Sequence, residues 1–318
     1  MSRLIAITGA TGFAGRHALS VLLARGHRLR ALVRTPARAA LPAEVETVQG
    51  ELGDAEAGAR LVAGADAVIH FAGALSALRR EDYFRVNAEG TAKLADAATA
   101  ARVARFVHIS SLSAREPALS AYGASKRAGE EAVLARMAAL TAIIIRPPAV
   151  YGPGDRATLP LIRGLTQPVA AIPGHAASRF SLIHAGDLAR IAAMALEVDD
   201  TGIHEVSDGT PGGYGWEDLI RIASALRGAP VRPLFLPRAI PAAVAFAAEA
   251  AARLTGRPGM INSGKIAELY HRDWVSREGT LALPDPITFG QGLAGTVAWY
   301  REAGWLPRAP GADRRSAH

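Results

Sequence analysis

Three glycines at intervals of three residues constrain the fold of this chain more than any other feature. Gly9, Gly12 and Gly15 follow the short apolar run Leu4–Thr8 and open a stretch with helical periodicity. Glycine lets the backbone turn tightly between a strand and a helix and approach a phosphate, whose charge the helix N-terminus stabilises. The spacing is G-x-x-G-x-x-G, not the more usual G-x-G-x-x-G. We interpret the run as a strand–turn–helix unit that binds a dinucleotide, with a plain glycine turn as the alternative.

The first 150 residues alternate short apolar runs with helical patterns, which is typical of parallel strands joined by crossover helices. Strands that are apolar at nearly every position are buried on both faces. The pattern therefore predicts an α/β fold, a doubly wound parallel Rossmann sheet with ligands at the carboxyl ends of its strands. The predicted strands are 4–8, 29–33, 44–48, 67–71, 105–110 and 141–146, and the predicted helices include 12–25, 83–101 and 122–139.

After Arg146 the sequence becomes richer in proline and glycine, and the predicted elements become shorter. We expect residues 1–150 to form the dinucleotide-binding Rossmann domain, which also receives later segments. Residues 151–307 are expected to form a smaller C-terminal α/β lobe that binds the substrate, and 308–318 a disordered tail. The predicted elements of this part are helices at 186–198, 216–227, 240–254 and 290–303 and a strand at 202–206.

Composition limits the partners of the chain. Among its 318 residues, 36 are lysine or arginine and 29 are aspartate or glutamate, so the formal net charge is +7. No basic run exceeds two residues and aromatic residues are few, so we predict no nucleic-acid partner. The absence of cysteine excludes disulfides, thiolate metal sites and cysteine nucleophiles, and we assign no metal site. With an N-terminus that runs straight into a strand pattern, this composition predicts a cytoplasmic protein.

The segment 239–252 is extremely rich in alanine and contains Pro241 and Glu249. It is too short and too weakly hydrophobic to span a bilayer. We interpret it as a helix that closes the substrate cleft, and peripheral membrane contact is the alternative.

A tyrosine and a lysine four residues apart form the second informative pattern. Residues i and i+4 share one face of a helix, so Tyr122 and Lys126 can point into the same cleft. A nearby ammonium group, together with the positive nicotinamide ring of an oxidised cofactor, would lower the pKa of the tyrosine, which is ordinarily about 10, toward neutrality. A serine at the end of the fifth predicted strand, Ser110 or Ser111, can hold a substrate oxygen against the tyrosine hydroxyl. Together with the glycine run, this pattern predicts hydride transfer at a carbonyl or carbinol.

The end of the second predicted strand bears on the choice of nicotinamide cofactor. A carboxylate there binds the ribose 2′-hydroxyl of NAD, whereas arginine accommodates the 2′-phosphate of NADP. This chain has Arg34 at that position, Arg38 four residues later and no acid nearby. We predict NADP(H) as the cofactor, with NAD(H) as the alternative.

Further motifs accompany these patterns in a fixed order. With them the chain resembles the extended short-chain dehydrogenases/reductases of the NAD(P)-dependent epimerase/dehydratase family over residues 3–306. This family includes nucleotide-sugar epimerases and dehydratases, 3β-hydroxysteroid dehydrogenases and dihydroflavonol reductases. The motifs that carry the resemblance lie at 8–15, 70–73, 86–91, 109–111, 122–126, 146–154 and 299–306.

The resemblance implies a role for each matching residue. Ser111, Tyr122 and Lys126 match the catalytic triad: Tyr122 is the acid and base, Ser111 orients the substrate carbonyl and Lys126 also binds the nicotinamide ribose. Ser111 is preferred to Ser110 because it aligns with the serine beyond the strand, and Asn87 has a structural role. The matches to cofactor-binding positions are Gly9, Thr11, Gly12, Phe13 and Gly15 at the pyrophosphate, Glu51 and Leu52 at the adenine, Phe71, Ala72 and Gly73 beside the adenosine ribose and pyrophosphate, and Pro147, Ala149 and Val150 at the nicotinamide amide.

Departures from the family's pattern weigh against a nucleotide-sugar substrate. Enzymes for such substrates commonly carry Arg-Asp before Phe-Ile-His-Val-Asp-Asp. Here Arg179 is displaced by one residue and Gly186 replaces one of the two acids. No acid lies beside Ser111, unlike in the dehydratases. Arg156 and Arg163 remain, with Arg179, candidate partners of a diphosphate.

These observations favour an NAD(P)H-dependent oxidoreductase that acts on a small or apolar carbonyl or secondary alcohol by a Ser-Tyr-Lys mechanism. One alternative is a nucleotide-sugar epimerase/dehydratase that holds NAD tightly. The other is a non-catalytic protein that senses a dinucleotide or assists assembly on the same fold. A homodimer is compatible with the sequence.

Overall fold

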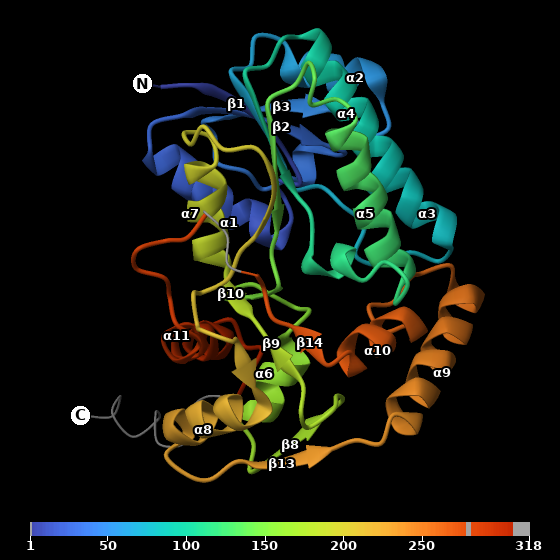
Figure 1. Cartoon of the computed structure of the whole chain (residues 1–318), viewed down its shortest axis with the longest axis vertical. Coiled ribbons are helices and arrows are strands. Elements are labelled where there is room, and N and C mark those ends of the chain that lie inside the picture. Colours follow the sequence, from blue (N-terminus) through green and yellow to red (C-terminus); the bar gives the residue numbers. More distant parts are fainter. Residues whose placement is uncertain (1, 278–280, 308–318) are drawn as a thin grey trace.

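The structure is a computed structural model that describes residues 2–277 and 281–307. A seven-stranded parallel sheet occupies the upper half of the molecule in Figure 1. The strand order is β11-β6-β5-β4-β1-β2-β3, so the chain starts in the middle of the sheet and winds outward in both directions. All neighbouring pairs are parallel, which confirms the predicted doubly wound sheet. The strands are β1 (Leu4–Thr8), β2 (Arg28–Val33), β3 (Val45–Gln49), β4 (Ala67–His70), β5 (Arg105–Ile109), β6 (Ala142–Arg146) and β11 (Gly202–Glu205).

Helices cover both faces of the sheet because its strands carry apolar side chains on both faces. Ile5 and Ile7 of β1 share a core with Leu22 on one face. Ala6, between them, belongs to the core of the other face, with Leu94. The strands β4, β5 and β6 are buried at every residue. The first face is covered by α1 (Phe13–Ala24) and α7 (Ala185–Met194), and the second by α2 (Ala55–Val62), α4 (Gly90–Ala100) and α5 (Ala121–Leu134).

The helix predicted over 83–101 is interrupted. A short helix, α3 (Arg80–Phe84), is followed by a π-helical turn, Arg85–Glu89, before α4 begins. A π-helical turn contains an extra residue, and such turns are frequent at functional sites. This one buries Asn87, whose Oδ1 accepts a hydrogen bond from the Ala74 N–H at 2.7 Å. The expectation of one regular helix was wrong here, because a contact with a distant loop, and no local preference, sets the geometry of the turn.

After β6 the chain crosses to a lower lobe, returns to the sheet for α7 and β11, and crosses again (Figure 1). Tyr151, Trp216, Phe289 and Tyr300 pack together in a core that belongs to the lobe. The tail expected at 308–318 lies outside the described residues, among which no helix is long and apolar enough to cross a membrane. The lobe contains β7 (Ala149–Tyr151), α6 (Leu159–Leu165), β8 (Val169–Ile172), β9 (Arg179–Phe180), β10 (Leu182–His184), β12 (Tyr214–Gly215), α8 (Trp216–Arg227), β13 (Arg232–Phe235), α9 (Ala239–Thr255), α10 (Ser263–Tyr270), β14 (Asp273–Trp274) and α11 (Phe289–Glu302).

Two glycines of α11 provide a test of the packing in the lobe. A Cβ at Gly292 would lie 2.8 Å from Cε2 of the buried Tyr151, whereas a Cβ at Gly295 would meet no atom within 4 Å. We expect Gly295→Ala to stabilise the protein by about 0.5–1 kcal/mol, since alanine loses less backbone entropy in a helix. Gly292→Ala should destabilise it by about 1–3 kcal/mol through overpacking. Urea unfolding measures both changes, and equal stability of the two variants would contradict the close packing of α11 on Tyr151.

Candidate active site

The turn between β1 and α1 has no room for side chains. Gly9 has a φ of +72°, in the left-handed region that favours glycine. A Cβ at Gly9 would lie 2.6 Å from the backbone nitrogen of Ala72, and a Cβ at Gly15 would lie 2.8 Å from the carbonyl carbon of Gly9. Gly12 is the N-cap of α1. No side chain caps this helix, and its first turn contains no acidic residue. The free N–H groups and the positive end of the helix dipole therefore suit a pyrophosphate.

The loop after β4 lies directly against this turn. The N–H of Phe71 donates a hydrogen bond to the Thr8 carbonyl at 3.1 Å, and the N–H of Ala72 donates to the Thr8 hydroxyl at 3.2 Å. That hydroxyl is 2.6 Å from Nδ1 of the buried His70, whose Nε2 is 2.9 Å from the Thr91 hydroxyl. Burial, with a smaller effect of a lysine charge, lowers the pKa of His70 to about 3. The ring is therefore neutral, and a buried chain of uncharged groups holds the loop.

Asn87 connects the same loop to the helix that carries the tyrosine and the lysine. Its amide nitrogen donates hydrogen bonds to the Ala74 carbonyl at 3.1 Å and to the Ser125 hydroxyl at 2.9 Å. A Cβ at Gly73 would lie 3.1 Å from Oδ1 of Asn87 and 3.8 Å from Nζ of Lys126. The loop, Asn87 and Lys126 therefore meet next to the glycine turn.

The other predicted cofactor-binding residues also follow strands at the carboxyl edge of the sheet. Arg34 follows β2 directly, and Arg38 ends the 3-10 turn that comes next. Both are exposed, and neither makes an ion pair within residues 2–277 and 281–307. The remaining positions are Thr11 in the glycine turn, Phe13 at the start of α1, Glu51 and Leu52 after β3, and Pro147, Ala149 and Val150 after β6.

Tyr122 lies in the first turn of α5. Ser120 caps this helix, since its hydroxyl accepts a hydrogen bond from the Gly123 N–H at 2.8 Å. Burial raises the pKa of Tyr122 to about 12, against the opposing effect of its interaction with the Ser111 side chain. The hydroxyl is therefore protonated at neutral pH. The lower pKa that the sequence predicts requires the positive nicotinamide ring of the oxidised cofactor as well as Lys126, and it stays a prediction.

Lys126 lies one turn further along α5 and is buried. Its Nζ donates a hydrogen bond to the carbonyl of Ile109, at the carboxyl end of β5, at 2.8 Å. Burial lowers the pKa of Lys126 to about 8, opposed by the Glu130 carboxylate. The side chain is thus a desolvated cation that is still largely charged at neutral pH.

The two neighbouring serines have different environments. Ser110 is buried and donates a hydrogen bond to Oε1 of the buried Glu130 at 2.6 Å. The same carboxylate accepts two hydrogen bonds from the Arg146 guanidinium, at 2.8 and 2.6 Å. Ser111 instead faces the tyrosine and caps the 3-10 turn that follows it. Ser110 therefore belongs to a buried ionic network, and Ser111 lies in the candidate site.

Sequence reasoning missed Tyr83 and two residues from the second half of the chain, which together flank the start of α5. The ring of Tyr83 packs edge-on against that of Tyr122, with centroids 6.4 Å apart. Nδ2 of Asn262 donates a hydrogen bond to the Tyr83 hydroxyl at 3.4 Å. Glu268, on α10, accepts a hydrogen bond from the Ser120 hydroxyl at 2.5 Å. The sequence holds no signal of these long-range contacts.

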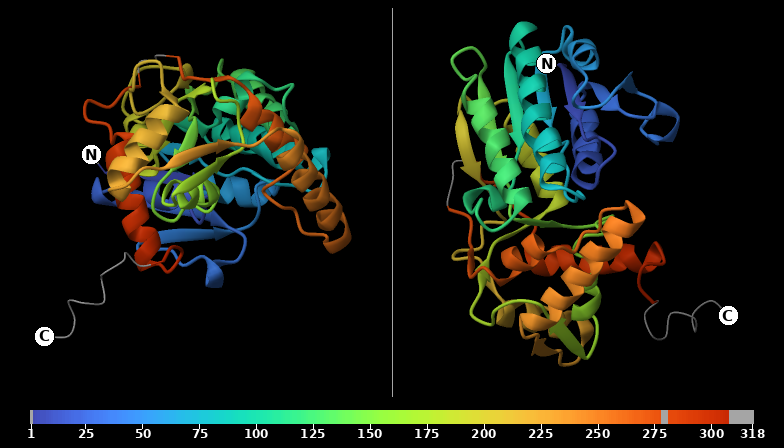
Figure 2. Two further views of the ribbon diagram at one scale, coloured as in Figure 1. Left: turned by 90° about the horizontal axis from the view of Figure 1, so that it is seen from below. Right: turned by 90° about the vertical axis from the view of Figure 1, so that its right-hand side faces the viewer.

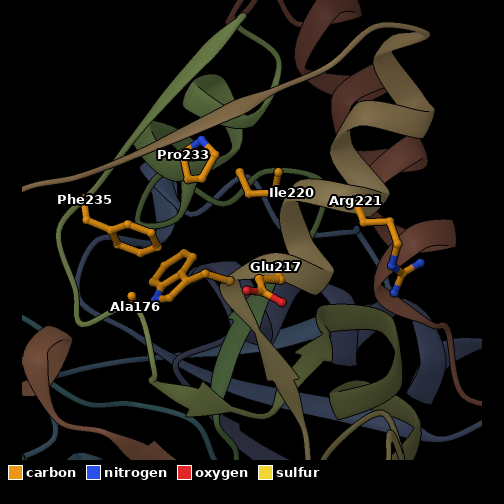
Figure 3. Close-up of a pocket in the computed structure, with 7 residues that line it drawn as sticks. Ala176, Glu217, Ile220, Arg221, Pro233 and Phe235 are labelled. Atoms are coloured by element: carbon orange, nitrogen blue, oxygen red, sulfur yellow. The ribbon is translucent and has the colours of Figure 1, made fainter.

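The lobe contains a cavity of about 270 Å³ that is separate from this site (Figure 3). It lies between α8 and β13, and Trp216, Ile220 and Phe235 contribute most of its apolar lining. None of the residues predicted to act in catalysis or to bind a cofactor lines it. We therefore do not assign the chemistry to this cavity.

The three arginines considered as partners of a diphosphate make contacts within the lobe. Arg179 donates hydrogen bonds to the carbonyls of the 212–213 turn at 2.8 to 3.0 Å. Arg163 donates to the carbonyl of Trp305 at 2.9 Å, and the Arg156 guanidinium lies 4.4 Å above the ring of the same tryptophan. All three guanidinium groups are therefore engaged with protein groups.

Comparison with known proteins matches the NAD dependent epimerase/dehydratase family to residues 5–207. The chain belongs to this family. A ceramide reductase of Caulobacter vibrioides (strain NA1000 / CB15N) is 42% identical over 310 residues, which cover 96% of each chain. A 4-hydroxy-2-methyl-3-oxo-4-farnesyl-3,4-dihydroquinoline-1-oxide ketoreductase of Stigmatella aurantiaca is 35% identical over 176 residues, 48% of this chain and 52% of that protein. The crystal structure of gox2253 has a TM-score of 0.73 at 25% identity and covers 96% of this chain and 100% of that chain.

Family membership and the relatives named as reductases identify this epimerase/dehydratase family member as an NAD(P)-dependent oxidoreductase. The similarity to the ceramide reductase includes the lobe, which the family model covers only in part.

The adjacent serines of this family member make a matched pair for mutagenesis. Ser111→Ala should lower turnover by about 10²-fold or more, because the substrate oxygen loses a hydrogen-bond donor, and leave stability nearly unchanged. Ser110→Ala should instead lower the free energy of unfolding by about 1–3 kcal/mol, since it removes a donor from a buried carboxylate. Oxidation of NADPH with a ketone substrate and urea unfolding provide the two readouts. Loss of turnover in Ser110→Ala at unchanged stability would reverse the assignment of the two serines.

Proposed function

We propose that this protein is an extended short-chain reductase that uses NADPH to convert a ketone on a long-chain lipid of the ceramide type into a secondary alcohol. The observation that carries the proposal is the geometry at the carboxyl end of β5. There, Ser111 interacts with the Tyr122 hydroxyl, and Lys126 lies one turn away against the loop that contacts the glycine turn. The substrate class is supported by the ceramide reductase, whose similarity extends over nearly the whole chain.

The chemistry of a nicotinamide cofactor limits which functional group of the substrate can react. Such a cofactor exchanges a hydride with a ketone or a secondary alcohol and leaves an amide unchanged. A ceramide carries an amide and hydroxyl groups, so the reducible form of such a lipid has a ketone in place of a chain hydroxyl. We therefore propose an oxo-ceramide as the substrate.

The residues at the carboxyl edge of the sheet fit a dinucleotide. The uncapped first turn of α1 and the close approach of Gly9 to the loop after β4 suit its pyrophosphate. Arg34 and Arg38 would hold a 2′-phosphate, and Lys126 would donate hydrogen bonds to the nicotinamide ribose. When bound, NADPH supplies the hydride.

The three side chains of the triad then have distinct tasks at the substrate ketone. Ser111 donates a hydrogen bond to the carbonyl oxygen and orients it. The carbonyl carbon receives the hydride, and the oxygen receives the Tyr122 proton, which the raised pKa of about 12 keeps on the hydroxyl until then. The Lys126 ammonium stabilises the phenolate that remains. The product is the secondary alcohol, and Tyr122 recovers its proton from solvent.

Arg156, Arg163 and Arg179 of the lobe already contact protein groups, which counts against a nucleotide-sugar substrate. A diphosphate buried in the cleft needs charge-assisted partners, and its burial without them costs several kcal/mol. Recruiting Arg179 would cost the 212–213 turn its hydrogen bonds. Retention of Ser111, Tyr122 and Lys126 likewise favours an enzyme over a dinucleotide sensor. A cytoplasmic location remains a prediction from the absence of cysteine.

The substrate proposal is tested by NADPH oxidation with an oxo-ceramide in detergent micelles. Tyr122→Phe removes one hydroxyl and almost no volume, so turnover should fall by about 10²–10⁴-fold while NADPH binding persists. Tyr270→Phe is the matched control, because its hydroxyl bonds the Leu236 carbonyl in the lobe. Near-normal turnover of Tyr122→Phe would contradict the mechanism. Micromolar binding of UDP, dTDP or GDP in calorimetry, with no oxidation of NADPH by the lipid, would favour the epimerase.

Cofactor preference depends on the charge at the end of β2. Pairing a 2′-phosphate with arginine is worth about 1.5–3 kcal/mol, or about ten- to a hundredfold in affinity, so NADPH should bind more tightly than NADH. Arg34→Asp should reduce or reverse that preference. Arg28→Asp, at the opposite end of the same strand, makes the same change of charge and should leave it unaltered. Fluorescence titration with both cofactors measures the ratio, and equal affinities in the wild type would refute the assignment.

A further inference from the structure

We propose that α9 and the turn after it dock this protein on the surface of an anionic lipid bilayer and so hold the entrance of the candidate active site at the membrane. The docking face is formed by the six exposed large apolar side chains of this segment. They are Ile240, Val244, Phe246, Leu254, Met260 and Ile261. The lipid nature of the substrate comes from the proposed function, but the membrane surface is argued from this segment alone.

The first observation is that α9 hardly packs on the protein. Only Pro241 and Ala245 of its 17 residues are buried. Phe246 is 74% exposed and Leu254 is 89% exposed. In Figure 1 this helix forms the right-hand edge of the lower lobe, and in the left view of Figure 2 it extends outward from the body of the protein.

The second observation is the direction of its apolar residues. Ala243, Phe246, Ala247, Ala250 and Leu254 follow the spacing of one helix face, and all five are exposed. An ordinary surface helix turns its apolar stripe toward the core and its polar residues outward. Here the outward face is apolar, which is the arrangement of a helix that lies in a membrane interface.

The docking face continues into a groove of about 230 Å³ between α9 and α10. Ile240, Val244, Ile261, Ile266 and Leu269 contribute to its lining, and Lys265 is the one charged residue there. Such a groove offers an acyl chain an apolar path away from the bilayer.

Charge identifies the bilayer as the partner. Arg238 precedes α9, Arg253 lies in its last turn and Arg257 follows it; all three are exposed and, within residues 2–277 and 281–307, make no ion pair. The acid of this helix, Glu249, accepts a hydrogen bond from the Ser263 N–H. An apolar face edged by unpaired arginines complements anionic headgroups. A two-fold contact between copies of this chain would bring the arginines of both copies into one interface, in which the acid of each α9 is already hydrogen-bonded.

The segment is joined to the start of α5, where the tyrosine lies. After the turn, Asn262 bonds the hydroxyl of Tyr83, whose ring packs on Tyr122. Glu268 bonds Ser120, the cap of α5. Docking at α9 therefore places the bilayer beside the part of the protein that contacts the start of α5.

The experiment is flotation of the full-length protein with vesicles of phosphatidylcholine, alone or mixed with phosphatidylglycerol. Binding should be at least about tenfold stronger to the mixed vesicles. The double variant Phe246→Ser/Leu254→Ser should lower binding by about tenfold or more. Leu226→Ser, which removes a 44% exposed leucine from α8, is the matched control and should bind as the wild type does. Arg253→Gln/Arg257→Gln should weaken binding to the anionic vesicles alone.

Two results would overturn the proposal. One is equal vesicle binding by the wild type and the Phe246→Ser/Leu254→Ser variant. The other is a dimer in light scattering that this variant loses, which would assign the docking face to a second copy. Reduction of a short, water-soluble ketone should be the same in the variant and the wild type. Vesicle binding without any ketone reduction would refute the proposed function and leave the docking face standing.

Discussion

The buried carboxylate of Glu130 is the interaction on which the candidate site depends. It lies on α5 and accepts hydrogen bonds from Ser110, which directly follows β5, and from Arg146 of β6. Arg146 is also 3.6 Å from Glu205 of β11. One helix and three neighbouring strands are thus connected through largely buried side chains. Removing one partner of such a pair typically costs about 3–5 kcal/mol, so α5 cannot rotate freely and Tyr122 is fixed with it.

Burial at this end of α5 acts in opposite directions on the two titratable groups of the triad. It raises the pKa of Tyr122 to about 12 and lowers that of Lys126 to about 8, because it disfavours the charged form of each. At neutral pH the result is a neutral phenol beside a cation that is still largely charged. This pair of states suits an enzyme that donates a proton to a ketone and then stabilises the phenolate.

Prediction from the sequence succeeded for features that neighbouring residues determine and failed for features that depend on residues far apart in the chain. The strands β1 to β6 were predicted within about one residue. Most of them are short apolar runs between turns, whereas β3, Val-Glu-Thr-Val-Gln, is not. The two-residue strand β9 has no periodicity and was missed. Ser110 and Ser111 are adjacent in the sequence, and the ion pair that separates their environments involves residues 20 and more positions away. Glu268, 148 positions from Ser120, carries no local signal at all.

The path of the chain through the sheet has a consequence for biosynthesis. The strand β11 pairs with β6, and α7 covers α1, but both are translated only after the first crossing to the lobe. Until Glu205 has left the ribosome, β6 pairs with β5 alone, and the other edge of its apolar core Ala-Ile-Ile-Ile is unpaired. An exposed edge of that kind recruits other strands. In the nascent chain this edge therefore stays open until β11 has been made, and a gene divided near residue 150 would leave both products with open apolar surfaces.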